Sequence, residues 1–210
     1  MSYQPSLSFC ITCKNRFHQI IRTLRQNLDD NRAHQQQIEF VLVDFGSNDG
    51  LRDWIISNFQ DDLMSGYLRY YYTNELMYWH ASVAKNTAHL LAQNDIAVNL
   101  DCDNYTGYHG GYFVIERFVN NRMDIVLHQF GGDLYDGSYG RISVLRKYFH
   151  YIGGYDELFD PMGYQDKDLF ERLEAAGLLY ILTSDYRYNN AICNTKKEGL
   201  LNTGSSKKFS

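Results

Sequence analysis

The sequence predicts an α/β protein in which helices flank a mainly parallel central sheet. Short apolar runs that suit buried strands alternate with segments whose apolar residues recur at helical spacing. Strands that alternate with helices in this way form βαβ units, whose strands run parallel. The chain has 210 residues, of which 44% are hydrophobic, enough for one sizeable core. Because no repeat, linker or low-complexity segment interrupts it, we predict a single domain over residues 1–210.

The first half of the chain alternates regularly between the two kinds of segment. Apolar runs predict buried strands at 7–12, 38–43, 67–72 and 96–100. Helices are predicted between them at 17–27, 51–59 and 82–93. The first helix has Ile20 and Leu24 on one face, as helical spacing requires. Polar residues at 13–16 and glycine-rich residues at 46–50 form the turns that follow the first two strands.

The second half is less regular. A helix is predicted at 112–119, and short strands are predicted at 125–128 and 142–145, with a glycine-rich connection at 131–140 between them. A further helix contains Phe170, Leu173 and Ala176 and stops at Gly177, which is a natural C-cap. The last strand covers 178–182. From Ser184 onward the chain is polar and lacks apolar periodicity, so we predict a loop-like tail that closes over a bound ligand.

The composition excludes several classes of protein. No stretch approaches the ~20 apolar residues of a membrane helix, and residues 1–5 lack the basic and apolar regions of a signal peptide. We therefore predict a cytoplasmic protein without a transmembrane segment. The net charge of −5 leaves no broad basic surface, so no nucleic-acid partner is predicted. Cys10 and Cys13 spell C-x-x-C, but strand residues three apart face opposite sides, which argues against a zinc or redox site.

Two carboxylates mark the most informative position in the chain. Asp101 and Asp103 directly follow the apolar strand at 96–100, at the carboxyl edge where open α/β sheets bind ligands. A carboxylate pair at this edge can hold one hard cation, Mg²⁺ or Mn²⁺, which completes its shell with water and phosphate oxygens. A nucleotide diphosphate is therefore the natural co-ligand. The alternative is that both acids are solvated loop residues.

Six segments, which follow one another along the chain, support the interpretation of Asp101 and Asp103 as a metal site. They are 12–16 (TCKNR), 43–50 (VDFGSNDG), 84–87 (AKNT), 100–103 (LDCD), 153–157 (GGYDE) and 165–173 (QDKDLFERL). With these segments the chain resembles GT-A glycosyltransferases, in particular the family-2 inverting enzymes and the β-1,4-galactosyltransferase group. The resemblance implies a Rossmann-like sheet, with a nucleotide-binding half at about 1–103. The remainder, about 104–210, would form a smaller acceptor-binding region and a C-terminal loop.

The resemblance also implies roles for individual residues. Asp166 falls at the position of the catalytic base. The implied metal is Mn²⁺ or Mg²⁺, and its ligands would be Asp101, Asp103 and, nearest the position of a late histidine in the family, Asn194. The residues implied to contact the nucleotide-sugar donor are Thr12, Asn15, Arg16, Asp44, Lys85, Asn86, Asp101 and Cys102. The sequence departs from the family at Gln165, where a glutamate is usual.

Each assignment has a structural alternative. Asp166 could cap its helix, and capping is the role we predict for Asp168. Asp44 could cap the helix at 51–59, for which Asp49 is the better candidate. Lys85 and Asn86 could lie on a solvated helix face. Arg16 could bridge a surface acid, and the aromatic residues at 78–80 could be partial core rather than a wall for a sugar ring.

The leading functional hypothesis is a metal-dependent inverting glycosyltransferase. It would use a nucleotide sugar, most simply a UDP-sugar, and a carbohydrate or glycoconjugate acceptor. A sugar-nucleotidyltransferase would need a glycine-rich phosphate loop after the first strand, and residues 13–16 contain no glycine. The substitution at Gln165 leaves a second alternative, a non-catalytic nucleotide-sugar-binding module of a larger synthase.

Overall fold

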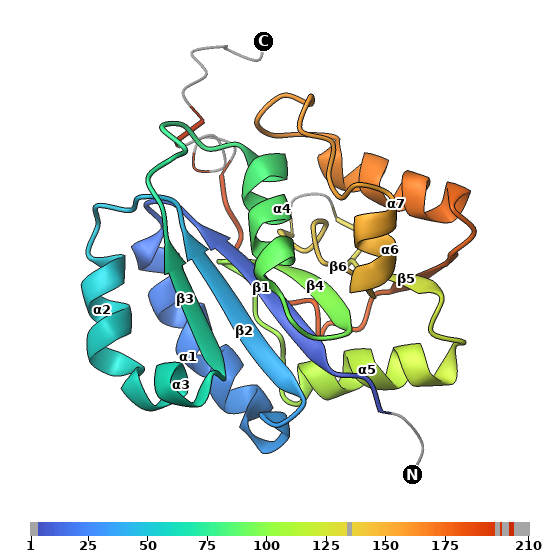
Figure 1. The fold of residues 1–210 in the computed structure, drawn as a ribbon, viewed down its shortest axis with the longest axis horizontal. Helices are drawn as coiled ribbons and strands as arrows, with labels where there is room; N and C mark the ends of the chain where they lie inside the picture. The colour runs from blue at the N-terminus through green and yellow to red at the C-terminus, as the bar shows by residue number, and fades with distance from the viewer. Residues whose placement is uncertain (1–3, 134–135, 196–197, 199–201, 204–210) are drawn as a thin grey trace.

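A seven-stranded sheet forms the centre of the molecule, with helices on both faces (Figure 1). The computed structural model describes residues 4–133, 136–195, 198 and 202–203. The strands are β1 (Leu7–Cys13), β2 (Ile38–Asp44), β3 (Leu68–Tyr72), β4 (Ile96–Asp101), β5 (Ile125–Gln129), β6 (Ile142–Leu145) and β7 (Leu179–Thr183). The helices are α1 (Phe17–Asn31), α2 (Leu51–Asn58), α3 (Gln60–Ser65), α4 (Ala81–Leu91), α5 (Gly110–Asn120), α6 (Arg146–Tyr151) and α7 (Gln165–Ala175), with a 3₁₀ turn at Arg32–His34.

The strand order β3-β2-β1-β4-β6-β5-β7 confirms the predicted mainly parallel sheet. β1, β2, β3 and β4 are parallel, whereas β6 runs antiparallel to β4 and β5. In the register, Thr12 pairs with Asp101, and Cys13 pairs with Asp44. The carboxyl ends of β1, β2 and β4 therefore lie side by side, as a site at this edge requires.

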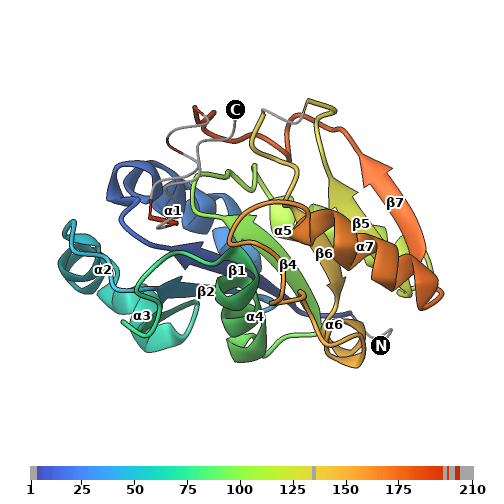
Figure 2. The ribbon, with the colours of Figure 1, turned by 90° about the horizontal axis from the view of Figure 1, so that it is seen from above.

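The strand residues alternate between two apolar layers. Leu7, Phe9 and Ile11 of β1 belong to the larger core with residues of α1, α2 and α5, whereas Cys10 packs against α4. A third cluster joins β5 and β6 to α6 and α7. Figure 2 shows α1 and α5 on one side of the sheet and α4, α6 and α7 on the other. Cys10 and Cys13 face opposite layers, as the spacing predicts.

Buried amides extend α1 beyond its predicted end at residue 27. Asn27 donates to Asn104 O at 2.9 Å and accepts from Thr106 N at 2.8 Å. Asn31 donates to the Thr106 hydroxyl at 2.8 Å. Because these side chains satisfy backbone and hydroxyl groups of the segment after β4, they fix the course of the chain just beyond Asp103.

Two short helices were not predicted. α3 contains mostly polar residues, so it carries no apolar periodicity, and α6 directly follows β6 without a turn residue between them. Neither changes the sheet. Among the described residues, no helix combines the length and apolar character that crossing a bilayer requires.

Candidate active site

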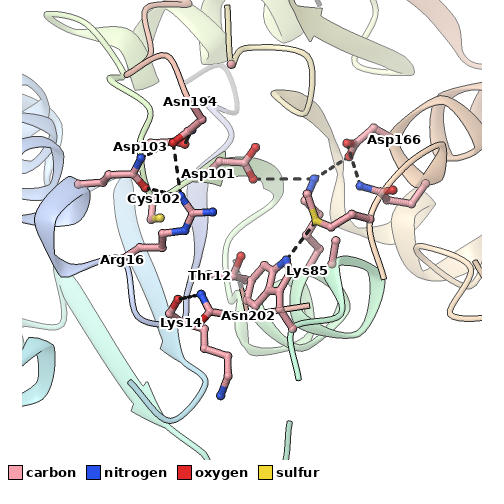
Figure 3. Close-up of a pocket in the computed structure, with 16 residues that line it drawn as sticks. Thr12, Lys14, Arg16, Lys85, Asp101, Cys102, Asp103, Asp166, Asn194 and Asn202 are labelled. Carbon is pink, nitrogen blue, oxygen red and sulfur yellow. Dashed lines mark hydrogen bonds and ion pairs between the residues drawn. The ribbon is translucent and has the colours of Figure 1, made fainter. Parts of the chain in front are cut away.

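A pocket opens where the carboxyl ends of β1 and β4 face the start of α7 (Figure 3). It brings together residues from all parts of the chain. Its lining is Thr12, Lys14, Arg16, Gln19, Trp79, Ala81, Lys85, Asp101, Cys102, Asp103, Gly137, Met162, Gln165, Asp166, Asn194 and Asn202. All three implied metal ligands, the implied base and most of the implied donor contacts are in this set. Asn15, Asp44 and Asn86 are not.

The two aspartates after β4 present oxygen atoms to the pocket. The Asp101 side chain is 35% exposed, and Asn99 Nδ2 donates to its Oδ1 at 3.2 Å. Asp103 is more enclosed, and burial together with the Asp101 carboxylate raises its pKa. These hard oxygen donors fit Mg²⁺ or Mn²⁺. Within the described residues no group of three or more His, Cys, Asp or Glu side chains could hold a metal, so a metal here would need other donors.

Amide side chains hold Asp103 in place. Asn104 Nδ2 donates to Asp103 Oδ1 at 2.7 Å, and the Asn194 amide nitrogen donates to Oδ2. The Asn194 oxygen accepts from Gln19 and, at 3.4 Å, from Arg16. In this orientation Asn194 supports Asp103 through its nitrogen, and its role as a metal ligand stays a prediction.

Asp166 faces Asp101 across the pocket at the start of α7. Lys85 Nζ donates to Asp166 Oδ1 at 2.7 Å, and Gln165 Nε2 donates to Oδ2 at 3.3 Å. The residue at the helix cap is Tyr164, and its side chain makes no capping hydrogen bond. The predicted capping by Asp168 is wrong, because its carboxylate forms an ion pair with Arg172, at 2.6 Å.

Lys85 is buried rather than solvated, which excludes the exposed-face alternative. It projects from α4, is 4% exposed, and lies 3.8 Å from Asp101 Oδ1 as well as 2.7 Å from Asp166. Burial acts to lower the pKa of Lys85, but the Asp101 and Asp166 carboxylates outweigh it and raise the pKa. Lys85 therefore keeps its positive charge and lies between Asp101 and Asp166.

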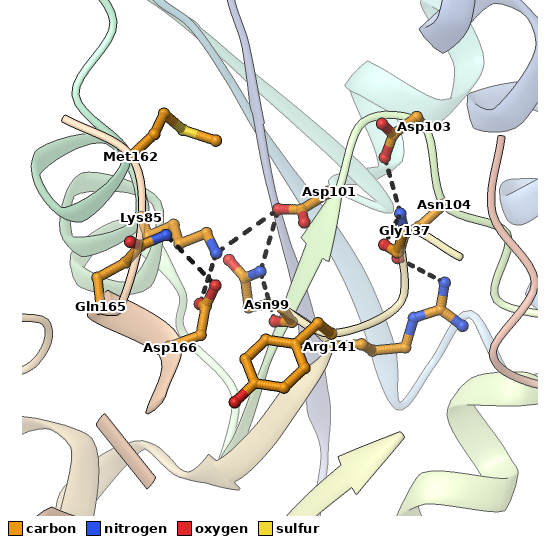
Figure 4. Close-up of polar contacts among 12 residues, drawn as sticks. Lys85, Asn99, Asp101, Asp103, Asn104, Gly137, Arg141, Met162, Gln165 and Asp166 are labelled. Atoms are coloured by element: carbon orange, nitrogen blue, oxygen red, sulfur yellow. Dashed lines mark hydrogen bonds and ion pairs between the residues drawn. The ribbon is translucent and has the colours of Figure 1, made fainter. Parts of the chain in front are cut away.

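A buried guanidinium group, which the sequence did not indicate, is linked to Asp103 through Asn104 (Figure 4). Arg141 is 1% exposed and has no carboxylate within ion-pair distance among the described residues. It donates to Asn104 Oδ1 at 2.7 Å, to Asn190 O at 3.0 Å and to Tyr188 O. Burial lowers its pKa to about 10. Through Asn104, Arg141 supports the side chain that binds Asp103.

Three implied donor contacts lie outside the pocket lining. Asp44 is fully buried, and its carboxylate accepts from Ser47 N and the Tyr70 hydroxyl, each at 2.8 Å. Asn86 binds both the N–H and the C=O of Tyr155 at 2.8 Å. These groups are already engaged within the protein. Donor contact by Asp44 and Asn86 stays a prediction.

Residues 15 and 49 organise the loops after β1 and β2. Asn15, at a φ of 52°, donates from its backbone N–H to the Ser47 hydroxyl and accepts from Asn48 N. Asp49 accepts from Phe17 N at 2.8 Å, so it caps α1 and not the helix that follows it. The sequence did not indicate this contact, because Phe17 and Asp49 are far apart along the chain. They meet only where the turns after β1 and β2 lie side by side.

The three aromatic residues at 78–80 differ in their surroundings, and a role for them as a wall for a sugar ring is not tested. Trp79 lines the pocket, and its indole N–H lies 3.2 Å from Met162 Sδ. Tyr78 is exposed, and His80 accepts from Val83 N at the start of α4. Gln19 and Met162 were missed, because neither residue type carries a signal for a binding site in the sequence.

A comparison of the sequence with models of protein families identifies the family of this chain. The sequence model described as "Glycosyl transferase family 2" matches residues 8–164, which is more than half of the chain. The chain belongs to glycosyl transferase family 2. This membership confirms the predicted resemblance and argues against the sugar-nucleotidyltransferase alternative. No curated protein matches the chain.

Solved structures agree with the GT-A glycosyltransferase fold. Mannosyltransferase PcManGT from Pyrobaculum calidifontis, in complex with GDP-Man and Mn²⁺, is 16% identical with a TM-score of 0.70, over 88% of this chain and 56% of that one. S. aureus TarS 1–349 is 14% identical with a TM-score of 0.68, over 87% and 59%. This chain thus spans a little over half the length of either.

Proposed function

We propose that this family 2 glycosyltransferase is metal-dependent and transfers a sugar with inversion from a nucleotide donor to an acceptor hydroxyl. The observation that carries the proposal is the pair Asp101 and Asp103 facing Asp166 across one pocket. Glycosyl transfer needs charge neutralisation at the diphosphate leaving group and proton removal from the acceptor. Carboxylates on opposite sides of a cleft can serve these two needs separately.

Asp101 and Asp103 are the residues that would hold a Mn²⁺ or Mg²⁺ ion. The metal would neutralise the diphosphate as a Lewis acid. The oxygen-rich donor set supports this assignment, and so does the Mn²⁺ named for the structurally similar mannosyltransferase. Asn194 is the candidate for a third ligand through its side-chain oxygen, which accepts from Arg16 and Gln19 in this structure.

Asp166 is the proposed general base. A carboxylate at this position can accept the acceptor's hydroxyl proton. Its hydrogen bonds to Lys85 and Gln165 orient the carboxylate. Attack from the side of Asp166, opposite the leaving diphosphate near Asp101, would invert the anomeric centre.

The donor is proposed to be a nucleotide sugar, with UDP as the first nucleotide to test. Thr12, Arg16 and Cys102 line the pocket beside the aspartates and are the nearest candidates for contacts with it. The mannosyltransferase of similar fold was solved with GDP-Man, so GDP donors belong in the same panel. The acceptor is proposed to be a carbohydrate or glycoconjugate.

Asp166→Asn tests the catalytic proposal, with Asp168→Asn as the matched control. Both residues lie in the first turn of α7, but only Asp166 faces the pocket. Loss of a general base lowers turnover ~10²–10⁴-fold, so Asp166→Asn should lose nucleoside diphosphate release while donor affinity is retained; its melting temperature should fall, because the buried Lys85 loses its nearest charged partner. Asp168→Asn should keep turnover. Near-wild-type turnover in Asp166→Asn would refute the base, whereas wild-type protein that binds the donor without turning it over would indicate a binding-only module.

A further inference from the structure

Three charged side chains from three elements converge beside the pocket (Figure 4). Lys85 Nζ on α4 lies 2.7 Å from Asp166 on α7 and 3.8 Å from Asp101 at the end of β4. The lysine side chain is nearly inaccessible, whereas Asp101 is about one-third exposed. The ammonium group therefore separates two carboxylates that would otherwise repel each other across the same space.

Gly140 provides the room for this arrangement. A Cβ at this position would lie 2.9 Å from Asp101 Oδ2, 3.1 Å from Lys85 Nζ and 3.4 Å from Asp166 Oδ2. Its φ lies outside the positive range, so close contact rather than backbone conformation favours glycine here. Its carbonyl accepts from Asn99 Nδ2 at 2.8 Å, and the same amide nitrogen reaches Asp101.

The burial of Lys85 distinguishes two possible roles. A lysine that binds donor phosphate must offer its ammonium group to the ligand, and its loss would weaken donor binding. Here the shortest contact of the ammonium is to Asp166, and the side chain is enclosed by the protein. Its loss would release Asp166 and remove the ion-pair partner that Asp101 has among the described residues.

We propose that Lys85 is a positioning residue that fixes Asp166 relative to Asp101, and that Gly140 keeps the space in which the three groups meet. This inference rests on the proposed function, because Asp166 is taken as the base. Misplacement of a reacting group by ~1 Å can cost ~10²-fold in rate. Loss of Lys85 should therefore reduce kcat and leave donor affinity unchanged.

Lys85→Met tests the role, with Lys167→Met as the control because Lys167 is half exposed and pairs with Glu171, away from the pocket lining. Nucleoside diphosphate release from a saturating nucleotide sugar gives kcat, and calorimetry with the same donor and Mn²⁺ gives Kd. We expect kcat to fall about tenfold or more in Lys85→Met with Kd within about threefold of wild type. Mn²⁺ affinity should not weaken, because the substitution removes a positive charge near Asp101. Lys167→Met should match wild type. A raised Kd with unchanged kcat would overturn the proposal and make Lys85 a donor ligand.

Gly140→Ala tests the same arrangement of Lys85, Asp101 and Asp166 without removing a charge. It replaces the first test if Lys85→Met does not fold. The added methyl group should displace the three side chains by a few tenths of an ångström, so kcat should fall; the donor Kd does not enter this test, because Asp101, a proposed metal ligand, is the nearest of the three groups. Wild-type kcat in Gly140→Ala would count against the proposal.

A double variant separates this inference from the proposed function. If Lys85 acts through Asp166, then Lys85→Met combined with Asp166→Asn should be no slower than Asp166→Asn alone. Fully additive losses would refute the positioning role and leave Asp166 as the base. Unchanged turnover in Asp166→Asn alone would instead refute the base itself.

Discussion

Replacement of the buried Arg141 by methionine gives the sharpest test of how the pocket is supported. The guanidinium group connects Asn104, which holds Asp103, with the carbonyls of Tyr188 and Asn190 in the segment after β7. Methionine fills similar volume but donates no hydrogen bond. The Arg141→Met variant therefore leaves three acceptors without this donor.

The expected loss can be worked out from two opposing effects. Hydrogen bonds from a charged donor contribute ~1.5–3 kcal/mol each, so the loss of three costs ~4.5–9 kcal/mol. The substitution also removes the cost of burying the charge. That burial lowers the pKa of Arg141 from 12.5 to about 10, which corresponds to ~3–4 kcal/mol at ~1.4 kcal/mol per pKa unit. We expect a net loss of ~1–6 kcal/mol in the free energy of unfolding.

Urea unfolding measures this loss, and Arg146→Met is the matched control. Arg146 is only half-buried and donates to the carbonyls of Ala92 and Asn94, away from the pocket. Arg146→Met should therefore lower the free energy of unfolding by less than Arg141→Met does. Amide exchange should show faster opening at Tyr105 and Ile192 only in Arg141→Met, because these amides donate to Asn190 O and Asp103 O. A loss below ~1 kcal/mol, or one equal to that of Arg146→Met, would refute the reasoning.

Two further predictions concern acid stability and the metal. Burial lowers the pKa of His89 from 6.5 to about 4. The unfolded chain therefore binds a proton between these values that the folded protein does not, so stability falls as the pH drops through this window, by up to ~3 kcal/mol. His89→Phe keeps the stacking on Phe149 and should flatten the dependence of unfolding free energy on pH between about 6.5 and 4; equal slopes in both proteins would contradict this. Asp101→Ala and Asp103→Ala should abolish Mn²⁺-dependent nucleotide binding, measured by calorimetry, with the fold intact by circular dichroism; unchanged binding in both variants would exclude the metal assignment.

The strand ends could be predicted from sequence because they depend on local patterns. The predicted ends of β1, β2 and β4 each lie within one residue of the observed ends. In a parallel sheet these ends share one edge, so local patterns alone place Asp101 and Asp103 beside the turn at 12–16. The family resemblance was needed to predict that Asp166 faces Asp101 and Asp103, because the sequence of α7 alone does not indicate where the helix lies relative to these aspartates.

The supporting contacts could not be predicted, because their partners are distant in sequence. Lys85 and Asp166 are 81 residues apart, and nothing in the segment 84–87 indicates that its lysine is buried. Arg141 is an isolated arginine after a glycine-rich connection, and only the packed fold shows that it is buried. The polar C-terminal end of α1 was missed for the same reason. The predicted lid in the tail lies partly outside the described residues, at 196–197, 199–201 and 204–210, and stays a prediction.

The most direct test of the proposed function is sugar transfer by the wild-type protein. A panel of UDP- and GDP-sugars is incubated with Mn²⁺ or with EDTA, with and without saccharide acceptors. Nucleoside diphosphate release is then followed, and NMR reads the anomeric configuration of the product. We expect release that requires the metal, and a product of opposite configuration to the donor. Metal-independent release, or a product that retains the donor's configuration, would contradict the proposal.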